Sequence, residues 1–251
     1  MSGTAGYDLR AETTEIAGDG GDLVEAYLAQ PLDGAPHGGV VVIHHMPGYD
    51  EATKEIARKF AFHGYLAILP NLYSREAPGA SPDDAAAAAR ALGGVPDERL
   101  VGDVRGAAAF LRALPGSNGR VGTIGYCSGG RQSFLAACSL PIDAAVDCYG
   151  AFVTGKPPEG LPLKVGPLVH LAGNLSCPLL GLFGAEDQYP TPEQTAELGR
   201  VLTGHGKEFE FHTYEHAGHA FFGTDRPSYR PEAANAGWRE IWRFFGKHLN
   251  G

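Results

Sequence analysis

Short apolar runs rich in branched side chains recur along this chain, separated by segments of helical periodicity. The run Val40–His44 is apolar almost throughout, as expected of a strand buried on both faces. Leu23–Ala29 is expected to be an edge strand that starts the fold. Further strands are predicted at Tyr65–Pro70, Val121–Gly125, Ala144–Tyr149, Leu179–Phe183 and Phe209–Tyr214. Strands alternating with helices indicate an α/β fold class, with a mostly parallel central sheet covered by helices on both faces.

The segments between these runs have the spacing of amphipathic helices. Glu51–Phe62 places Ile56, Phe60 and Ala61 on one side of a helix. Further helices are predicted at Asp84–Ala91, Leu100–Leu114, Gln132–Cys138 and Ala233–Leu249. The last helix aligns Trp238, Ile241, Trp242 and Phe245, a stripe that we interpret as core packing rather than a cofactor-binding face.

The composition fits one domain over residues 1–251, since α/β folds reach roughly 250 residues as a single unit. Within it, Gly150–Ser176 is rich in Pro and Gly and is predicted to be a lid or cap over the site. The formal net charge of −9 and the lack of a Lys/Arg cluster argue against nucleic acid and anionic membranes as partners. The oligomeric state stays open.

The start of the chain and its cysteines suggest a compartment. Met1–Asp19 lacks the basic start and apolar run of a secretion signal, and no stretch approaches the roughly 18 apolar residues of a membrane span. The four cysteines have no C-x-x-C spacing, so neither a metal site nor a redox pair is expected. Free thiols in the cytoplasm are the expectation.

The strongest chemical signal is Gly125-Tyr126-Cys127-Ser128-Gly129-Gly130, which follows a predicted strand and precedes a predicted helix. This is the context of a nucleophile elbow, G-x-S-x-G, with Cys in place of Ser. The glycines allow the sharp turn, and the helix N-terminus favours a thiolate. Cys127 is therefore the predicted nucleophile; Ser128 is a lesser competitor, because it lies off the apex.

A thiol nucleophile needs a base, and a histidine base needs an acid to orient it. His219 follows the strand that ends at Tyr214, and Asp187 follows the strand Leu179–Phe183. The order Cys127, Asp187, His219 is that of α/β hydrolases. The alternatives are His216 as the base, and Glu186 or Asp147 as the acid.

The oxyanion of an acyl transfer is usually bound by two backbone N–H groups. One is expected from Ser128, directly after the nucleophile, and the second from Met46, in the loop after the strand Val40–Ile43. Pro47 has no N–H and cannot serve.

These motifs resemble the dienelactone hydrolase family (carboxymethylenebutenolidases), which has the α/β-hydrolase fold. The resemblance runs from about Val24 to Leu249; besides the elbow it includes Ser117-Asn118-Gly119-Arg120-Val121-Gly122, Gly64-Tyr65-Leu66-Ala67, Pro70-Asn71-Leu72-Tyr73, Gly184 to Asp187 and Ala217-Gly218-His219-Ala220-Phe221. It implies a lactone or ester hydrolase in which Cys127 attacks the carbonyl, His219 moves protons and Asp187 holds the histidine. No cofactor is implied.

The chain departs from the family pattern at two places. Where the family has a glutamate near the resting cysteine, this chain has His45, which either pairs with the thiolate or simply packs. His44 is expected to point away, since neighbours on a strand alternate faces.

The family also binds its substrate's carboxylate with arginines, one of them four residues after the catalytic histidine, where this chain has Gly223. Tyr126 and the nearby arginines Arg75, Arg131 and Arg226 are the remaining candidates for the surroundings of the substrate and nucleophile.

Two other classes of function compete with a cysteine hydrolase. One is a small-molecule receptor on the same fold, which would not require an intact Cys, His and Asp set. The other is a thiol redox sensor built on Cys127, which would need Cys148 or Cys177 brought close by folding.

Overall fold

The computed structural model describes residues 8–250, so the beginning of the segment searched for a secretion signal lies outside it. One eight-stranded sheet has the order β1-β2-β4-β3-β5-β6-β7-β8. Its strands are β1 (Leu9–Ala17), β2 (Leu23–Pro31), β3 (His37–Ile43), β4 (Leu66–Pro70), β5 (Ser117–Tyr126), β6 (Ala144–Cys148), β7 (Leu179–Gly184) and β8 (Phe209–Tyr214). β1 and β2 run antiparallel to their neighbours and the strands from β4 to β8 are parallel, which confirms the predicted α/β class.

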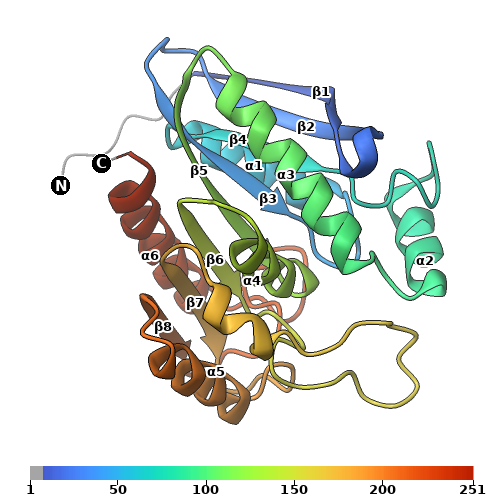
Figure 1. Cartoon of the computed structure of the whole chain (residues 1–251), viewed down its shortest axis with the longest axis vertical. Helices are drawn as coiled ribbons and strands as arrows, with labels where there is room; N and C mark the ends of the chain where they lie inside the picture. Colours follow the sequence, from blue (N-terminus) through green and yellow to red (C-terminus); the bar gives the residue numbers. More distant parts are fainter. Residues whose placement is uncertain (1–7, 251) are drawn as a thin grey trace.

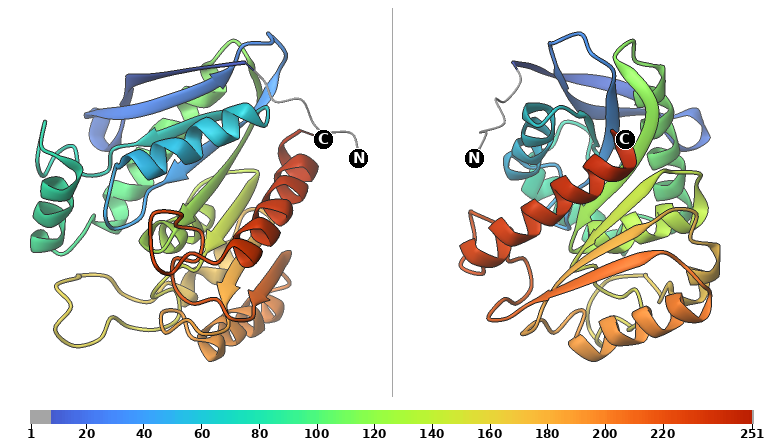
Figure 2. Two further views of the ribbon diagram at one scale, coloured as in Figure 1. Left: turned by 180° about the vertical axis from the view of Figure 1, so that it is seen from behind. Right: turned by 90° about the vertical axis from the view of Figure 1, so that its left-hand side faces the viewer.

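Helices lie on both faces of this sheet. They are α1 (Glu51–Phe62), α2 (Pro82–Leu92), α3 (Asp97–Ala113), α4 (Ser128–Ser139), α5 (Pro192–Gly204) and α6 (Pro231–Leu249), with short 3-10 turns η1 (Asp19–Gly21) and η2 (Val169–Asn174). Figure 1 shows α3, α4 and α5 in front of the sheet, and the rear view in Figure 2 shows α1 and α6 covering the other face.

The alternation of side chains along β3 divides the core into two layers. Val41 and Ile43 belong to the layer under α3 and α4. Val40 and Val42 belong to the layer that contains Phe60 of α1 and Phe245 of α6. Both layers are apolar, which is why β3 is buried along its whole length.

One prediction about the elements is wrong, and one helix was not predicted. Leu23–Ala29 does not start the fold at an edge, because β1 pairs outside it through nine residues. β1 is mostly polar and exposed on one face, so its sequence does not resemble a buried strand. Helix α5 was missed, although Thr191 and Gln194 form a capping box at its start.

The strand predicted at Val121–Gly125 begins earlier than expected. The strand already begins at Ser117, and Gly119 takes a φ of 86° within it. The pairing of β5 with β3 is irregular in this region, where the register shifts between His37 and Gly39.

The parallel register brings the ends of distant strands together. Ile43 pairs with Gly125, Tyr126 with Cys148, and Gly184 with Tyr214. The loops that follow β3, β5, β7 and β8 therefore meet at one edge of the sheet, where open α/β sheets bind their ligands.

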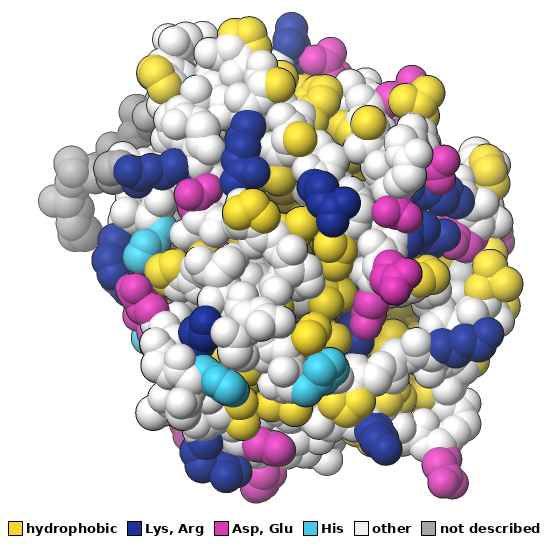
Figure 3. All heavy atoms as spheres, viewed as in Figure 1, with side chains coloured by type: hydrophobic (Ala, Val, Ile, Leu, Met, Phe, Trp, Pro, Cys, Tyr) yellow, Lys and Arg dark blue, Asp and Glu magenta, His cyan; other side chains and the backbone are white. Residues whose placement is uncertain are grey.

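No helix within residues 8–250 is long and apolar enough to cross a membrane. On the face in Figure 3, acidic and basic side chains are interspersed rather than gathered by sign.

Candidate active site

Cys127 forms the corner between β5 and α4. Its backbone dihedral angles, φ 57° and ψ −120°, lie in a region that residues other than glycine rarely adopt. A Cβ on Gly125 would collide with the backbone of Gly129, and one on Gly129 would collide with the carbonyl of Ile43. These two glycines let the turn approach β3 closely while it presents the sulfur at the start of α4.

The other three cysteines are unsuited to nucleophilic chemistry. All four thiols are free. Burial raises the pKa of Cys138 and of Cys177 to about 12, and raises the pKa of Cys148 well above its usual value. A thiol with so high a pKa stays protonated near neutral pH.

His219 and Asp187 meet at the same edge of the sheet. Nδ1 of His219 lies 2.9 Å from Oδ2 of Asp187, and Oδ1 of Asp187 accepts the backbone N–H of Tyr189 at 2.8 Å. The Asp187 side chain is only 1% exposed, so both of its oxygens are satisfied within the protein. The acid thus holds the imidazole with Nε2 directed away from it.

The same imidazole also interacts with the thiol of Cys127. Burial by itself lowers the pKa of His219, but hydrogen bonds with Asp187 and with Cys127 outweigh it and raise the pKa to about 10. The ring of Tyr149 packs edge-on against His219 with 5.1 Å between centroids. The elbow cysteine, the histidine and the acid therefore form one connected group.

The alternatives from the sequence are not bonded to this connected group. The His216 side chain is 91% exposed and faces Glu186, itself 61% exposed, at 3.6 Å. Asp147 is buried beneath the elbow, where Oδ1 accepts the N–H of Gly150 at 2.7 Å and burial raises its pKa to about 7.

Both expected oxyanion donors lie beside the cysteine. Met46 and Ser128 line the same cavity as Cys127 and His219. Neither backbone N–H has an acceptor within residues 8–250. Two free N–H groups next to a nucleophile suit a tetrahedral oxyanion.

His45 is paired with an acid that the sequence analysis did not single out. Its Nε2 lies 2.6 Å from Oδ2 of Asp50, whose Oδ1 caps α1 by accepting the backbone N–H of Thr53 at 2.8 Å. Burial raises the pKa of Asp50, but hydrogen bonds from His45 and Thr53 outweigh it and lower the pKa. The ionised acid therefore keeps a proton of His45 on Nε2. The sequence signal that could have pointed to Asp50 is its position directly before a predicted helix, where Asp is a favoured N-cap residue.

His44 does point away from the site, as its place at the end of the strand predicted. Nδ1 donates to the carbonyl of His45 at 2.8 Å, and Nε2 accepts the N–H of Leu72 at 3.2 Å. Burial lowers its pKa to about 4, so the ring is neutral and ties β3 to the loop after β4.

The three candidate arginines have different surroundings. Arg75 is not brought to the cysteine: its guanidinium binds Asp103 at 2.8 and 2.9 Å and Asp22 at 2.9 Å. Arg131 borders the cysteine's cavity but is committed to Asp97 at 2.7 and 2.9 Å.

Arg226 borders a different cavity. Its only ion pair among the described residues is with the adjacent Asp225, at 3.8 Å.

Two cavities adjoin Cys127. The first, of about 330 Å³, also contains His219, Asp187, Met46 and Ser128, and we call it the triad cavity. Phe152, Leu161, Leu163 and Val165, from the predicted lid segment, form part of its wall.

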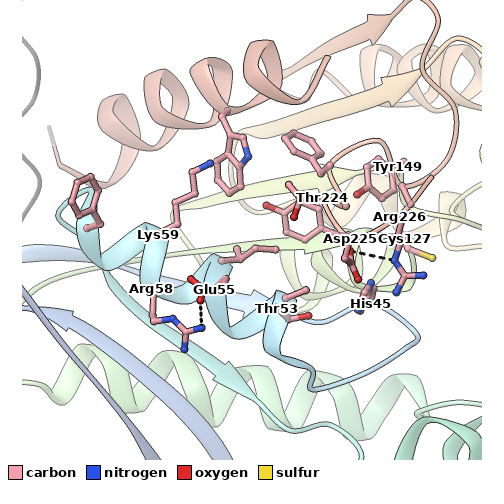
Figure 4. A pocket seen from close by; sticks show the side chains of 18 of the residues that line it. His45, Thr53, Glu55, Arg58, Lys59, Cys127, Tyr149, Thr224, Asp225 and Arg226 are labelled. Atoms are coloured by element: carbon pink, nitrogen blue, oxygen red, sulfur yellow. Dashed lines mark hydrogen bonds and ion pairs between the residues drawn. The ribbon is translucent and has the colours of Figure 1, made fainter. Parts of the chain in front are cut away.

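The second cavity, of about 490 Å³, is lined by Tyr126, Tyr149, Phe222, Trp238 and His45, and we call it the aromatic cavity (Figure 4). The hydroxyl of Tyr126 is buried there and has no hydrogen-bond partner among residues 8–250. Trp238 thus faces a cavity, whereas Ile241 and Phe245 of the same stripe are fully buried in the core.

Within residues 8–250, no group of three or more His, Cys, Asp or Glu side chains could hold a metal ion.

Comparisons with known proteins agree over nearly the whole chain. A model described as the dienelactone hydrolase family matches residues 24–249. An Escherichia coli K12 protein, provisionally named carboxymethylenebutenolidase, is 33% identical over 234 residues, which cover 91% of this chain and 84% of that protein. A Bradyrhizobium protein, provisionally named 2-oxo-3-(5-oxofuran-2-ylidene)propanoate lactonase, is 30% identical over 237 residues, 93% of each.

A crystal structure from Klebsiella pneumoniae, provisionally assigned as a dienelactone hydrolase, is similar with a TM-score of 0.84 and 29% identity. The match covers 96% of this chain and 100% of that one.

Proposed function

This chain belongs to the dienelactone hydrolase family, and from that premise we propose that it hydrolyses a carboxylic ester or lactone through an acyl intermediate on Cys127. The observation that carries the proposal is the connection of one imidazole to both a buried carboxylate and the elbow thiol. That arrangement suits covalent catalysis, in which a base first activates a nucleophile and later returns the proton.

Acylation begins from the resting pair, in which His219 holds the proton of the Cys127 thiol, and the sulfur bonds to the carbonyl carbon. The carbonyl oxygen becomes an oxyanion that accepts the N–H groups of Met46 and Ser128. When this intermediate collapses, the C–O bond breaks and the leaving oxygen takes the proton from His219. The product is a thioester on Cys127 and a free alcohol, or a single ring-opened acyl chain if the substrate is a lactone.

Deacylation repeats the sequence with water. His219 removes a proton from water as the water oxygen bonds to the thioester carbon. The C–S bond then breaks, the resting pair of Cys127 and His219 is restored, and the carboxylic acid leaves. Asp187 keeps the ring oriented in both halves and stays ionised.

His45, held by Asp50, belongs to the proposed surroundings of the nucleophile, together with Tyr126. Because Asp50 binds Nε2, Nδ1 is the ring nitrogen of His45 left for the aromatic cavity, which His45 lines. The segment 150–176 is proposed as the cap of the triad cavity, since it supplies part of the cavity wall. Four free thiols are consistent with a reducing cytoplasm.

Acyl trapping tests the proposal. The protein is mixed with a slowly hydrolysed p-nitrophenyl ester, quenched in acid, digested and examined by mass spectrometry. We expect the acyl mass on the peptide that carries Cys127. In Cys127→Ala the adduct should disappear and kcat/KM should fall by about 10³-fold or more, while the circular dichroism spectrum is unchanged.

Cys177→Ala is the matched control, because this thiol is also partly exposed but lies outside both cavities. Its activity should equal that of the wild type. Full activity in Cys127→Ala, or an acyl group on Ser128, would refute the cysteine mechanism. Ester binding without turnover would favour a non-catalytic receptor.

A further inference from the structure

Cys127 is the one described residue that lines both the triad cavity and the aromatic cavity. The other residues that surround the two spaces differ completely. A carbonyl bonded to this sulfur therefore stands at the junction of two separate chambers. Each is large enough for a ring-sized group, since ligand pockets start at about 300 Å³.

The chemistry assigns one arm of an ester to each chamber. His219 must give its proton to the leaving oxygen, so the alcohol arm lies on the side of His219. His219, Met46 and Ser128 all line the triad cavity, which is also where the oxyanion would sit. The acyl arm extends from the third position of the carbonyl carbon, and the aromatic cavity is the remaining space.

The aromatic cavity suits an apolar or aromatic acyl group. The rings of Tyr126, Tyr149, Phe222 and Trp238 border it. An aromatic group can pack against such rings edge-on or offset.

Three cations line the aromatic cavity, and Arg226 is paired only with the adjacent Asp225, at 3.8 Å, among the described residues. Arg58 is bound to Glu51, Glu55 and the hydroxyl of Tyr27. The ammonium of Lys59 lies 3.8 Å from the centroid of the Trp238 ring, and burial lowers its pKa to about 8. In Figure 4 the side chains of Arg58 and Lys59 project from α1 at a distance from the cysteine end of the cavity, whereas Arg226 lies beside Cys127.

The triad cavity suits an apolar alcohol. Val95, Phe152, Leu161, Leu163 and Val165 form an apolar part of its wall, which also includes Arg90. The buried Arg131 that borders it is neutralised by Asp97.

From these observations we propose that the substrate is an open-chain ester with two separate apolar arms, an aromatic or branched acyl arm in the aromatic cavity and an apolar alcohol arm in the triad cavity. The inference rests on the proposed esterase function and narrows it. A compact lactone joins its acyl and alkoxy ends in one ring, so the two ends cannot extend separately into the two cavities that Cys127 lines.

Two isomeric esters test the assignment of the arms. Methyl phenylacetate has a bulky acyl arm and a small alcohol, and benzyl acetate has the reverse. Ile56→Trp fills the aromatic cavity and Leu163→Trp fills the triad cavity; both residues are partly exposed, so the two variants are matched.

We expect Ile56→Trp to lower kcat/KM for methyl phenylacetate about tenfold or more, and to change it for benzyl acetate less than about twofold. Leu163→Trp should give the opposite pattern. Equal losses on both esters, or the reversed pattern, would overturn the proposal.

A measurement on the wild type does not depend on the folding of either variant. Benzyl phenylacetate, which fills both chambers, should have a higher kcat/KM than δ-valerolactone, although the lactone is intrinsically the more reactive. A preference for the lactone would overturn the two-arm substrate while leaving the hydrolase intact. Acyl trapping on Cys127 reports on the proposed function separately.

Discussion

Nδ1 of His219 lies 2.9 Å from a carboxylate oxygen of Asp187, and that carboxylate is almost completely withdrawn from solvent. The pair joins two loops that are 32 residues apart in the chain. One oxygen of Asp187 accepts the N–H of Tyr189 and the other is bound to His219. The carboxylate is therefore fixed, and it holds the imidazole in one orientation.

Asp187→Asn should lower kcat by on the order of 10³- to 10⁴-fold. The amide keeps the shape of the acid but loses its charge, and its NH₂ group favours the wrong tautomer of the imidazole. Steady-state hydrolysis of an ester, normalised to folded protein, measures this. Glu208→Gln is the control, since its exposed side chain pairs with Lys247 and lies outside both cavities, and it should retain wild-type activity.

The stability contributed by His219 should depend on pH. Its pKa is 6.5 in the absence of perturbation and about 10 in the folded protein, so the folded state binds the proton more tightly. The resulting stabilisation is complete below pH 6.5 and is lost as the pH rises through about 10. The difference in free energy of unfolding between wild type and His219→Gln, from urea titrations across this range, should shrink as pH increases.

Cys127→Ala provides the control for this pH effect, because the thiol contributes to the raised pKa. In the Cys127→Ala background, the loss of unfolding free energy caused by His219→Gln should change over a narrower range of pH. A difference that stays constant between neutral and alkaline pH would contradict the interaction of His219 with its two partners.

Asp50 should have two separable roles. Asp50→Ala removes both the cap of α1 and the acceptor of His45 and should destabilise the protein by about 1 kcal/mol through the lost cap alone. Asp50→Ser can still cap the helix but cannot reach and hold His45, so it should recover most of that stability. Thermal unfolding of the two variants compares them, and equal melting temperatures would contradict the capping role.

Arg75 should matter for stability and not for catalysis. Asp103 is fully buried, and Arg75→Met leaves its charge without the guanidinium, which should cost about 3–5 kcal/mol. At a temperature where the variant is still folded, kcat/KM should match the wild type. The control Arg112→Met removes an exposed pair with Asp143 and should cost at most about 1 kcal/mol. A selective rise in KM in Arg75→Met would restore Arg75 as a substrate contact.

Much of the sheet could be predicted because buried parallel strands are continuous apolar runs. β3, β4, β6 and β7 are of this kind. β1 could not be recognised in the same way, since its place is decided by pairing with β2 and not by its own burial. The candidate residues Cys127, Asp187 and His219 could be proposed because each follows the end of a strand within a few residues.

The sequence by itself determined the strand-to-helix corner at Cys127 and the order of the acid and the histidine, because glycine spacing and strand ends are local signals. The tertiary structure decided which charges are neutralised, as with Arg75 and Asp103, which lie 28 residues apart, and Arg131 and Asp97, which lie 34 apart. It also decided that Cys127 stands between two cavities. The physical reason is that ion pairing and cavity shape depend on side chains from several elements that pack together. A local sequence pattern does not show which distant side chains become neighbours.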